Sequence, residues 1–340
     1  MSYLTKAGLL WGQVPHTTGR VYFVSPGATY TIAGRTYSAS DDHDGLSPER
    51  ALRTVAQAIT NASASVGDVI VLLEGTHTVT ATVGVSKAGL TFVGLSRDDL
   101  SDPDLFTMRP PTILTSTGTT DELLNITASN QTFVGLTIRG TTATSAVSFQ
   151  TSDALDNIVF RRCHFDLYTP AVNTATLAVD LGNRQGGTGA TRLLTSASAV
   201  TNVVLDRCTF ESDGAQGQAV YAATGGVTAS KCKFFVTAGT WASPYIIGFD
   251  SQNCRILNSE FIQQNNGGVS TWIDGSLANY PQSLYITRCH FVATAQTNAI
   301  RGFTGNEVVA DHVWAGHTAN RAPLGTTGIA TFNAIAQLTS

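Results

Sequence analysis

A nine-residue unit that recurs along the chain constrains its fold more than any other feature. It reads NIVFRRCHF from Asn157, NVVLDRCTF from Asn202 and SLYITRCHF from Ser283. Six further copies begin at Gly67, Gly89, Asn130, Gly226, Asn253 and Asn306. Positions 2 and 4 of the unit are mostly apolar, position 6 breaks the alternation, and positions 7 and 9 are small or apolar. This pattern predicts two short strands joined by a one-residue corner, both turning the same side inward.

The spacing of the units predicts a solenoid. Copies of position 7 are mostly 22 to 30 residues apart, and intervals of 41 and 45 residues leave room for an insertion or an extra coil. Such a period of short strands is typical of solenoids. Candidates for a third strand stand at 177–181, 219–223, 245–250 and 271–275. We therefore predict an all-β, single-stranded parallel β-helix of about nine coils.

The repeat also accounts for the cysteines. Four of the five occupy position 7, namely Cys163, Cys208, Cys232 and Cys289. We expect them to stack as buried free thiols, which pack as small hydrophobes, rather than to serve metal or redox chemistry. The phenylalanines at position 9 should form a matching column. Arg162 should mark the corner, with Arg161 and His164 facing outward, and no cofactor is expected.

A helix is expected to cover the first coil. In the segment PERALRTVAQAITNASA from Pro48, Leu52, Val55 and Ile59 recur at three- and four-residue steps, as on one face of a helix. Ser47 is placed to cap its N-terminus, with Pro48 just inside. Because uncovered strand edges pair with other chains, we interpret this segment as a lid.

The N-terminal part of the sequence resembles a known family. VYFVSP at 21–26, DDHDGLSPERALRTVAQAI at 41–59 and GDVIVLLEGTHTV at 67–79 are similar to the cap and first coil of pectin-lyase-like right-handed β-helix proteins. His77 replaces the aromatic residue usual in that family. The resemblance implies a right-handed helix. It leaves function open, because the family includes pectate lyases, glycosidases, bacterial surface proteins, and bacteriophage tailspike and virion proteins.

Four segments follow from the repeat and the resemblance. Residues 1–20 form an N-terminal arm, 21–66 the cap with its helix, 67–314 the β-helix body and 315–340 a C-terminal tail. The tail is small and apolar with hardly any charge. We expect both ends to be held by neighbouring chains in an assembly.

The acidic residues in the cap are candidates for a metal site. Asp41 and Asp42 form an Asp-Asp pair in the cap turn, and with Asp44 they could bind calcium through carboxylate oxygens. The alternative is that these residues stand in the turn for backbone reasons. The calcium-ligand cluster of the family's lyases is not found, and neither are the Gly-His-Gly and Arg-Ile-Lys motifs of its hydrolases.

Three further aspartates are the candidates for catalysis. Asp180, Asp250 and Asp274 each close a third-strand candidate. Asp250 and Asp274 should lie on adjacent coils, and two carboxylates about 5 to 9 Å apart could hydrolyse a glycoside. The alternative is that all three end strands and bind turn amides.

The outward residues at position 8 offer little chemistry. They are His164, Thr209, Lys233, Glu260 and His290. Lys233 and Glu260 should form a surface ion pair, and each histidine should be exposed. The later coils carry Trp241, Trp272 and Trp314, which could stack on sugar rings or a partner if exposed and would be core residues if buried.

Charge and hydropathy exclude two classes of partner. The formal net charge of −4 disfavours nucleic-acid binding, which needs a basic surface. No apolar run reaches the roughly 18 to 20 residues that span a membrane. The N-terminus does not read as a secretion signal.

These observations lead to one functional hypothesis and two alternatives. The first is a non-catalytic structural virion protein of a bacteriophage, a capsid-decoration or tail-associated surface protein. It would be a homotrimer whose tails contact other virion proteins, assembled in the host cytoplasm. The alternatives are a tailspike-type polysaccharide lyase or glycosidase, and a non-catalytic adhesin that binds host surface polysaccharide.

Overall fold

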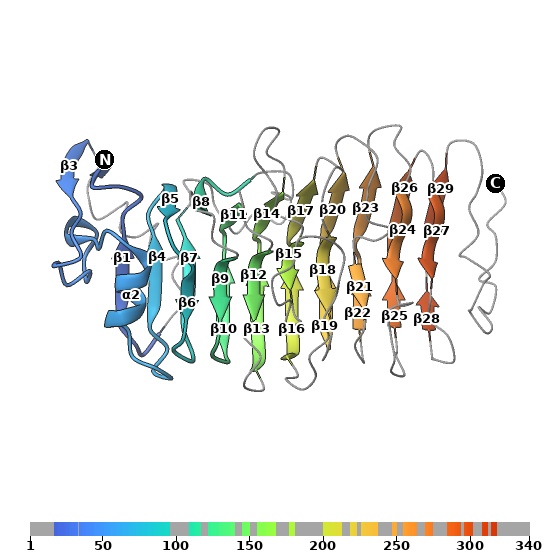
Figure 1. Ribbon diagram of the computed structural model, residues 1–340, viewed down its shortest axis with the longest axis horizontal. Coiled ribbons are helices and arrows are strands. Elements are labelled where there is room, and N and C mark those ends of the chain that lie inside the picture. The colour runs from blue at the N-terminus through green and yellow to red at the C-terminus, as the bar shows by residue number, and fades with distance from the viewer. Residues whose placement is uncertain are drawn as a thin grey trace.

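The computed structural model shows an elongated solenoid (Figure 1). The structure describes residues 17–32, 34–95, 109–116, 122–139, 145–149, 155–167, 177–180, 200–212, 218–222, 226–236, 247–249, 254–263, 269–274, 284–293, 296–301, 308–311 and 314–317. Three parallel sheets run along its length, and a complete coil contributes one strand to each sheet. The predicted all-β parallel β-helix is therefore confirmed.

The first sheet has ten strands and the second has nine. The first sheet contains β1 (Val21–Val24), β4 (Val69–Leu72), β7 (Thr91–Gly94), β10 (Gln131–Val134), β13 (Leu155–Arg161), β16 (Val200–Asp206), β19 (Val227–Ser230), β22 (Cys254–Leu257), β25 (Leu284–Thr287) and β28 (Val308–Asp311). The second contains β5 (Gly75–Val79), β8 (Thr112–Ser116), β11 (Thr137–Arg139), β14 (His164–Leu167), β17 (Thr209–Ser212), β20 (Lys233–Val236), β23 (Glu260–Gln263), β26 (His290–Ala293) and β29 (Trp314–His317).

The third sheet has eight strands, and four of them fall on the predicted third-strand segments. It contains β6 (Val83–Val85), β9 (Glu122–Ile126), β12 (Ser145–Phe149), β15 (Leu177–Asp180), β18 (Gln218–Ala222), β21 (Ile247–Phe249), β24 (Val269–Asp274) and β27 (Gln296–Arg301). The nine sequence units correspond to the nine first-sheet strands from β4 to β28. Since β10 pairs directly with β7 and β13 with β16, the two long intervals hold insertions and not an extra coil.

The corners of the coils adopt left-handed backbone conformations at two positions of the unit. Position 1 has φ near +60° at Asn130, Asn157 and Asn202. Position 6 has φ between 49° and 54° at Arg162, Arg207, Lys231, Asn258 and Arg288. Non-glycine residues seldom adopt this conformation, and asparagine does so most readily. The one-residue break predicted at position 6 is therefore a left-handed residue that turns the chain from the first sheet to the second.

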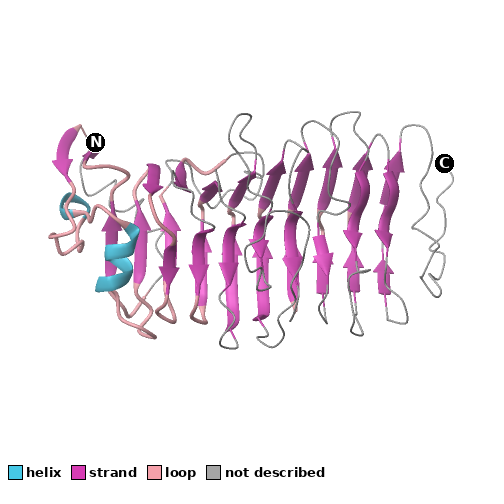
Figure 2. Ribbon diagram, viewed as in Figure 1, coloured by secondary structure: helices cyan, strands magenta, loops and turns pink. Residues whose placement is uncertain are grey.

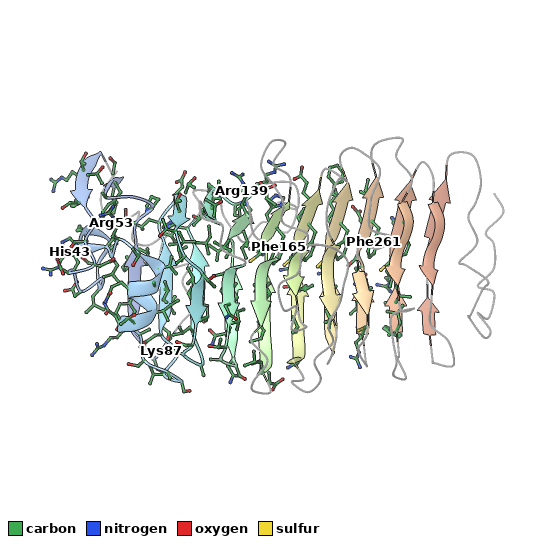
Figure 3. The ribbon with its side chains drawn as sticks, in the orientation of Figure 1. His43, Arg53, Lys87, Arg139, Phe165 and Phe261 are labelled. Atoms are coloured by element: carbon green, nitrogen blue, oxygen red, sulfur yellow. The ribbon has the colours of Figure 1, made fainter. Side chains whose placement is uncertain are left out.

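Stacked phenylalanines fill the interior along most of the solenoid. Phe92, Phe133 and Phe160 stack from the first sheet with centroids 4.8 Å apart. An edge-to-face contact of 5.5 Å then joins Phe160 to Phe165. From Phe165 the second-sheet stack continues through Phe210, Phe234, Phe261 and Phe291 at 4.4 to 4.9 Å. Figure 3 labels Phe165 and Phe261 within this stack. The predicted position 9 column is confirmed, and it continues into the first sheet.

The cap differs from the single helix that the sequence predicts. A short 3₁₀ helix, η1 (Pro48–Arg50), is followed by extended backbone at Ala51, and the α-helix α2 (Val55–Asn61) begins after Thr54. Leu52 interrupts the helix because it joins the first sheet: its N–H donates to Phe23 O at 2.8 Å. Thr54, and not Ser47, caps α2 by accepting a hydrogen bond from the Gln57 N–H.

The cap nevertheless covers the first coil as expected. Val55, Ala58 and Ile59 of α2 are buried in the main core. A hairpin of β2 (Thr29–Ile32) and β3 (Arg35–Ser38) packs Tyr30 over the outer face of the first sheet. The helices lie at the N-terminal end (Figure 2). At the opposite end, β29 crosses the predicted boundary between body and tail, so residues 315–317 belong to the solenoid.

Candidate functional site

The cap aspartates bind backbone amides and neighbouring side chains. Asp41 accepts hydrogen bonds from the Arg53 and Thr54 N–H groups at 3.0 and 2.9 Å, and from Thr54 Oγ1. Asp42 lies 3.4 Å from Ser40 Oγ, and Asp44 accepts from the Leu46 N–H. Asp41 thus orients the start of α2. Among the side chains that the structure describes, no three His, Cys, Asp or Glu groups converge to hold a metal ion.

The three candidate catalytic aspartates belong to or border the third sheet. Asp180 ends β15 and Asp274 ends β24, and they occupy one register row that also contains Tyr221, Gly248 and Arg301. Since β15 and β24 are three strands apart, the two aspartates are about 14 Å apart along the sheet. Asp250 lies outside the described residues, so its predicted pairing with Asp274 stays a prediction.

A cluster of charged side chains lies on the second sheet around β11, β14 and β17. Arg139 Nε donates to Asp166 Oδ2 at 2.9 Å. Arg109 binds Glu211 with two hydrogen bonds, of 3.1 and 2.6 Å. His164 Nε2 lies 3.6 Å from Glu211 Oε2 and makes no hydrogen bond. Figure 3 labels Arg139, which lies on β11.

The prediction that His164 is exposed is wrong. Only 3 % of its surface is accessible, and burial lowers its pKa to about 4. Nearby Asp166 raises the pKa, while Arg109 and Arg139 lower it. The neutral ring is therefore the stable form in the folded protein at pH 7. By contrast, His290, which occupies position 8 in a later coil, is exposed as predicted.

Sequence reasoning missed this cluster because its members are far apart along the chain. Arg109 and Glu211 are separated by 102 residues. The register that aligns Arg139, Asp166 and Glu211 depends on which strands pair. The length of the insertions hides this register, although the row could have been found by extending the alignment one residue beyond each unit.

The other predictions for polar residues have mixed outcomes. Lys233 Nζ lies 3.7 Å from Glu260 Oε2, which confirms the predicted surface pair. Arg161 is exposed and pairs with Asp206 at 3.1 Å. Trp272 and Trp314 lie within β24 and β29, and Trp241 falls outside the described residues.

The cysteines of position 7 are buried, free thiols that pack in the core. All five cysteines are free and buried, which confirms the predicted thiol state. Cys163, Cys208, Cys232 and Cys289 each lie within 3.5 Å of a carbonyl oxygen of a preceding coil. Burial raises the pKa of the Cys289 thiol to about 11, and it also raises the pKa of the Cys208 thiol well above its usual value. Such thiols stay protonated and react slowly.

Comparison with known proteins supports the fold. No protein-family model matches the sequence, and no curated protein matches it. Among solved structures, a pectin methylesterase from Erwinia chrysanthemi is 14 % identical with a TM-score of 0.52, covering 96 % of this chain and 94 % of its own. A pectin methylesterase from Aspergillus niger is 10 % identical with a TM-score of 0.54, covering 89 % and 88 %.

The similarity to these enzymes is one of architecture. At 10 to 14 % identity it shows that this chain shares the parallel β-helix fold of these enzymes. Proteins of one fold perform many functions, so activity has to be argued from the site itself. Within the described residues, no helix has the length and apolar character needed to cross a membrane.

Proposed function

We propose that this chain is a non-catalytic structural protein of a bacteriophage particle, a β-helical capsid-decoration or tail-associated surface protein. The observation that carries the non-catalytic part is the pairing of acids on the outer faces. Asp166, Asp206, Glu211 and Glu260 each pair with a basic side chain from another coil. A carboxylate held in this way binds coils together and is less available as a general acid or nucleophile.

The spacing of the third-sheet acids supports the same conclusion. Two carboxylates that cleave a glycosidic bond stand roughly 5 to 9.5 Å apart. Asp180 and Asp274 are three strands apart, about 14 Å at the usual strand spacing. These two residues are therefore too far apart to act on one glycosidic bond.

The proposal also includes a location on a phage particle and an assembly of several copies. They are supported by the resemblance of the cap to a family that includes phage virion proteins. A rigid core of stacked rings suits a protein that must keep its shape on a particle surface. We expect a homotrimer, with contacts to other virion proteins made through the two ends of the chain.

Three measurements test the proposal together. Native mass spectrometry of the purified protein should give three times the 35.8 kDa chain mass. Incubation with polygalacturonate, alginate and neutral glucans should release no reducing ends. Peptide mass spectrometry of gradient-purified phage particles should detect the chain. A monomer that degrades polysaccharide and is absent from particles would overturn the proposal.

A second candidate, a polysaccharide-degrading enzyme, is favoured by the third-sheet row. Tyr221, Asp274 and Arg301 share that row. If this row were catalytic, Asp274→Asn would abolish any release of reducing ends, while Asp180→Asn would not. Equal activity in both variants would exclude Asp274 as the acid.

A further inference from the structure

A column of basic residues runs along the corner between the first and second sheets. Position 6 holds Arg162, Arg207, Lys231, Asn258 and Arg288 in five successive coils, from β13 to β26 (Figure 1). We call this column the basic ridge. At the usual strand spacing it spans about 19 Å.

The ridge residues are an unfavourable choice for the backbone they occupy. Every one of them has a positive φ, a conformation that costs a non-glycine residue about 1 kcal/mol or more. Asparagine adopts it most readily, and the same coils use asparagine at position 1, in Asn157 and Asn202. Position 6 uses asparagine only at Asn258 within these five coils. Backbone geometry therefore does not explain why position 6 carries basic side chains.

The backbone also fixes the spacing of the ridge. The Arg207 N–H donates to Ser230 O at 2.8 Å, and the Lys231 N–H donates to Leu257 O at 2.9 Å. The same bond links Asn258 N–H to Thr287 O. Each corner is thus held one coil from the next. Like charges at this separation repel one another, so the ridge is electrostatically poised for an anion.

Charge is strongly concentrated around the ridge. The five units contain seven basic residues and two acidic ones, a formal excess of five positive charges. Both acids are already paired, Asp206 with Arg161 and, at 4.0 Å, with Arg207 of the ridge, and Glu260 with Lys233. Because the whole chain carries −4, the rest of the molecule carries −9. A narrow positive strip on an acidic protein is a specific feature and not a consequence of composition.

The flanking first-sheet residues offer groups that recognise sugars. Tyr285 is 41 % exposed, and its register partner Arg255 on the neighbouring strand is exposed too. The hydroxyl groups of Thr228, Ser230 and Thr287 lie on the same outer face beside them. Aromatic faces and hydroxyl groups bind sugar rings, while arginine binds carboxylates.

We propose that the basic ridge binds a linear polysaccharide bearing carboxylates, lying parallel to the solenoid axis. A polyuronate carries one negative charge per sugar and spaced hydroxyl groups, which suit charges one coil apart. A nucleic acid is denser in charge and binds proteins with an extended basic surface, whereas this chain is acidic outside the ridge. The proposal goes beyond a structural role and rests on the ridge alone.

The test removes charge without straining the fold. Lys231 and Arg288 are exposed left-handed residues, so the double variant K231N/R288N replaces them by the residue best suited to that backbone. Its thermal midpoint should be unchanged or slightly raised. The matched control R35N/R53N removes two exposed charges from the cap. Affinity for polygalacturonate is measured by isothermal titration at 50 and 200 mM salt, with dextran as the neutral polymer.

We expect the wild type and R35N/R53N to bind polygalacturonate equally, and more weakly at the higher salt. K231N/R288N should bind about tenfold more weakly, with a smaller dependence on salt. Dextran should not compete. The proposal is overturned if both double variants bind alike, if dextran binds as well, if the wild type shows no binding, or if single-stranded DNA of equal charge binds more tightly.

Discussion

At the scale of single residues, His164 is the side chain whose environment departs most from its pattern. It stands at position 8, where residues of the later coils are at least partly accessible, yet it is buried. The charged groups near it are Asp166 on its own strand, Glu211 on β17, Arg139 on β11, and Arg109. Its neutral form is stable because burial penalises the charged ring by more than the attraction of Asp166 favours it, and Arg109 and Arg139 lower the pKa further.

This burial predicts that stability depends on pH. In the unfolded chain His164 binds a proton below about pH 6.5, but in the folded protein it does so only near pH 4. Protons therefore favour the unfolded state between these values, and stability falls as pH drops through this range. The loss should be on the order of 3 kcal/mol. His77, whose pKa burial also lowers to about 4, should add a similar loss.

Urea unfolding at pH 7 and pH 4.5 measures this effect. The variant His164→Gln should lose less stability between the two pH values than the wild type does. His290→Gln, at an exposed position 8, should behave like the wild type. Equal pH dependence in all three proteins would mean that His164 is not charged on unfolding.

At the scale of elements, the coil has two inward columns that tolerate change differently. From Cys163 to Cys289, position 7 holds small groups, with Ser259 in place of cysteine in one coil. Ser259 Oγ donates to Leu257 O at 2.9 Å, so a hydroxyl group is satisfied there. Position 9 holds rings stacked on both sides, as Phe234 is between Phe210 and Phe261. Removing a ring at position 9 would therefore leave a cavity between the rings of the two adjacent coils.

Paired variants in one coil test this difference. Phe234→Ala should lower the free energy of unfolding by about 3 to 5 kcal/mol, because it leaves a cavity in the stack. Cys232→Ser should cost less than about 1 kcal/mol, since carbonyl oxygens of Leu205 and Ser230 already lie within 3.5 Å of the sulfur. Chemical unfolding measures both. Equal losses would show that the thiol packs as critically as the ring.

At the scale of the whole molecule, stability should be distributed along one dimension. Each coil contacts its two neighbours through three sheets, and the cap closes the first coil. In such arrays a defect weakens adjacent repeats more than distant ones. The stacked rings from Phe92 to Phe291 carry this coupling.

Hydrogen exchange followed by mass spectrometry can resolve that distribution. In Phe234→Ala, amides of β22 and β25 should lose protection, while those of β4 and β7 should keep it. The capped end is stabilised by α2, whose buried residues pack against the first coils. A uniform loss of protection from β4 to β28 would instead mean that the solenoid unfolds as one unit.

The sequence by itself determined the solenoid, because alternation and a break at position 6 are local properties of nine residues. From them followed the nine coils, the inward cysteine and phenylalanine columns, and the corner at Arg162. The tertiary structure decided which residues meet across the coils. Arg109 reaches Glu211 beside the buried His164, and Leu52 leaves the predicted helix to join β1. These contacts depend on loop lengths and on sheet register, which no short sequence window contains.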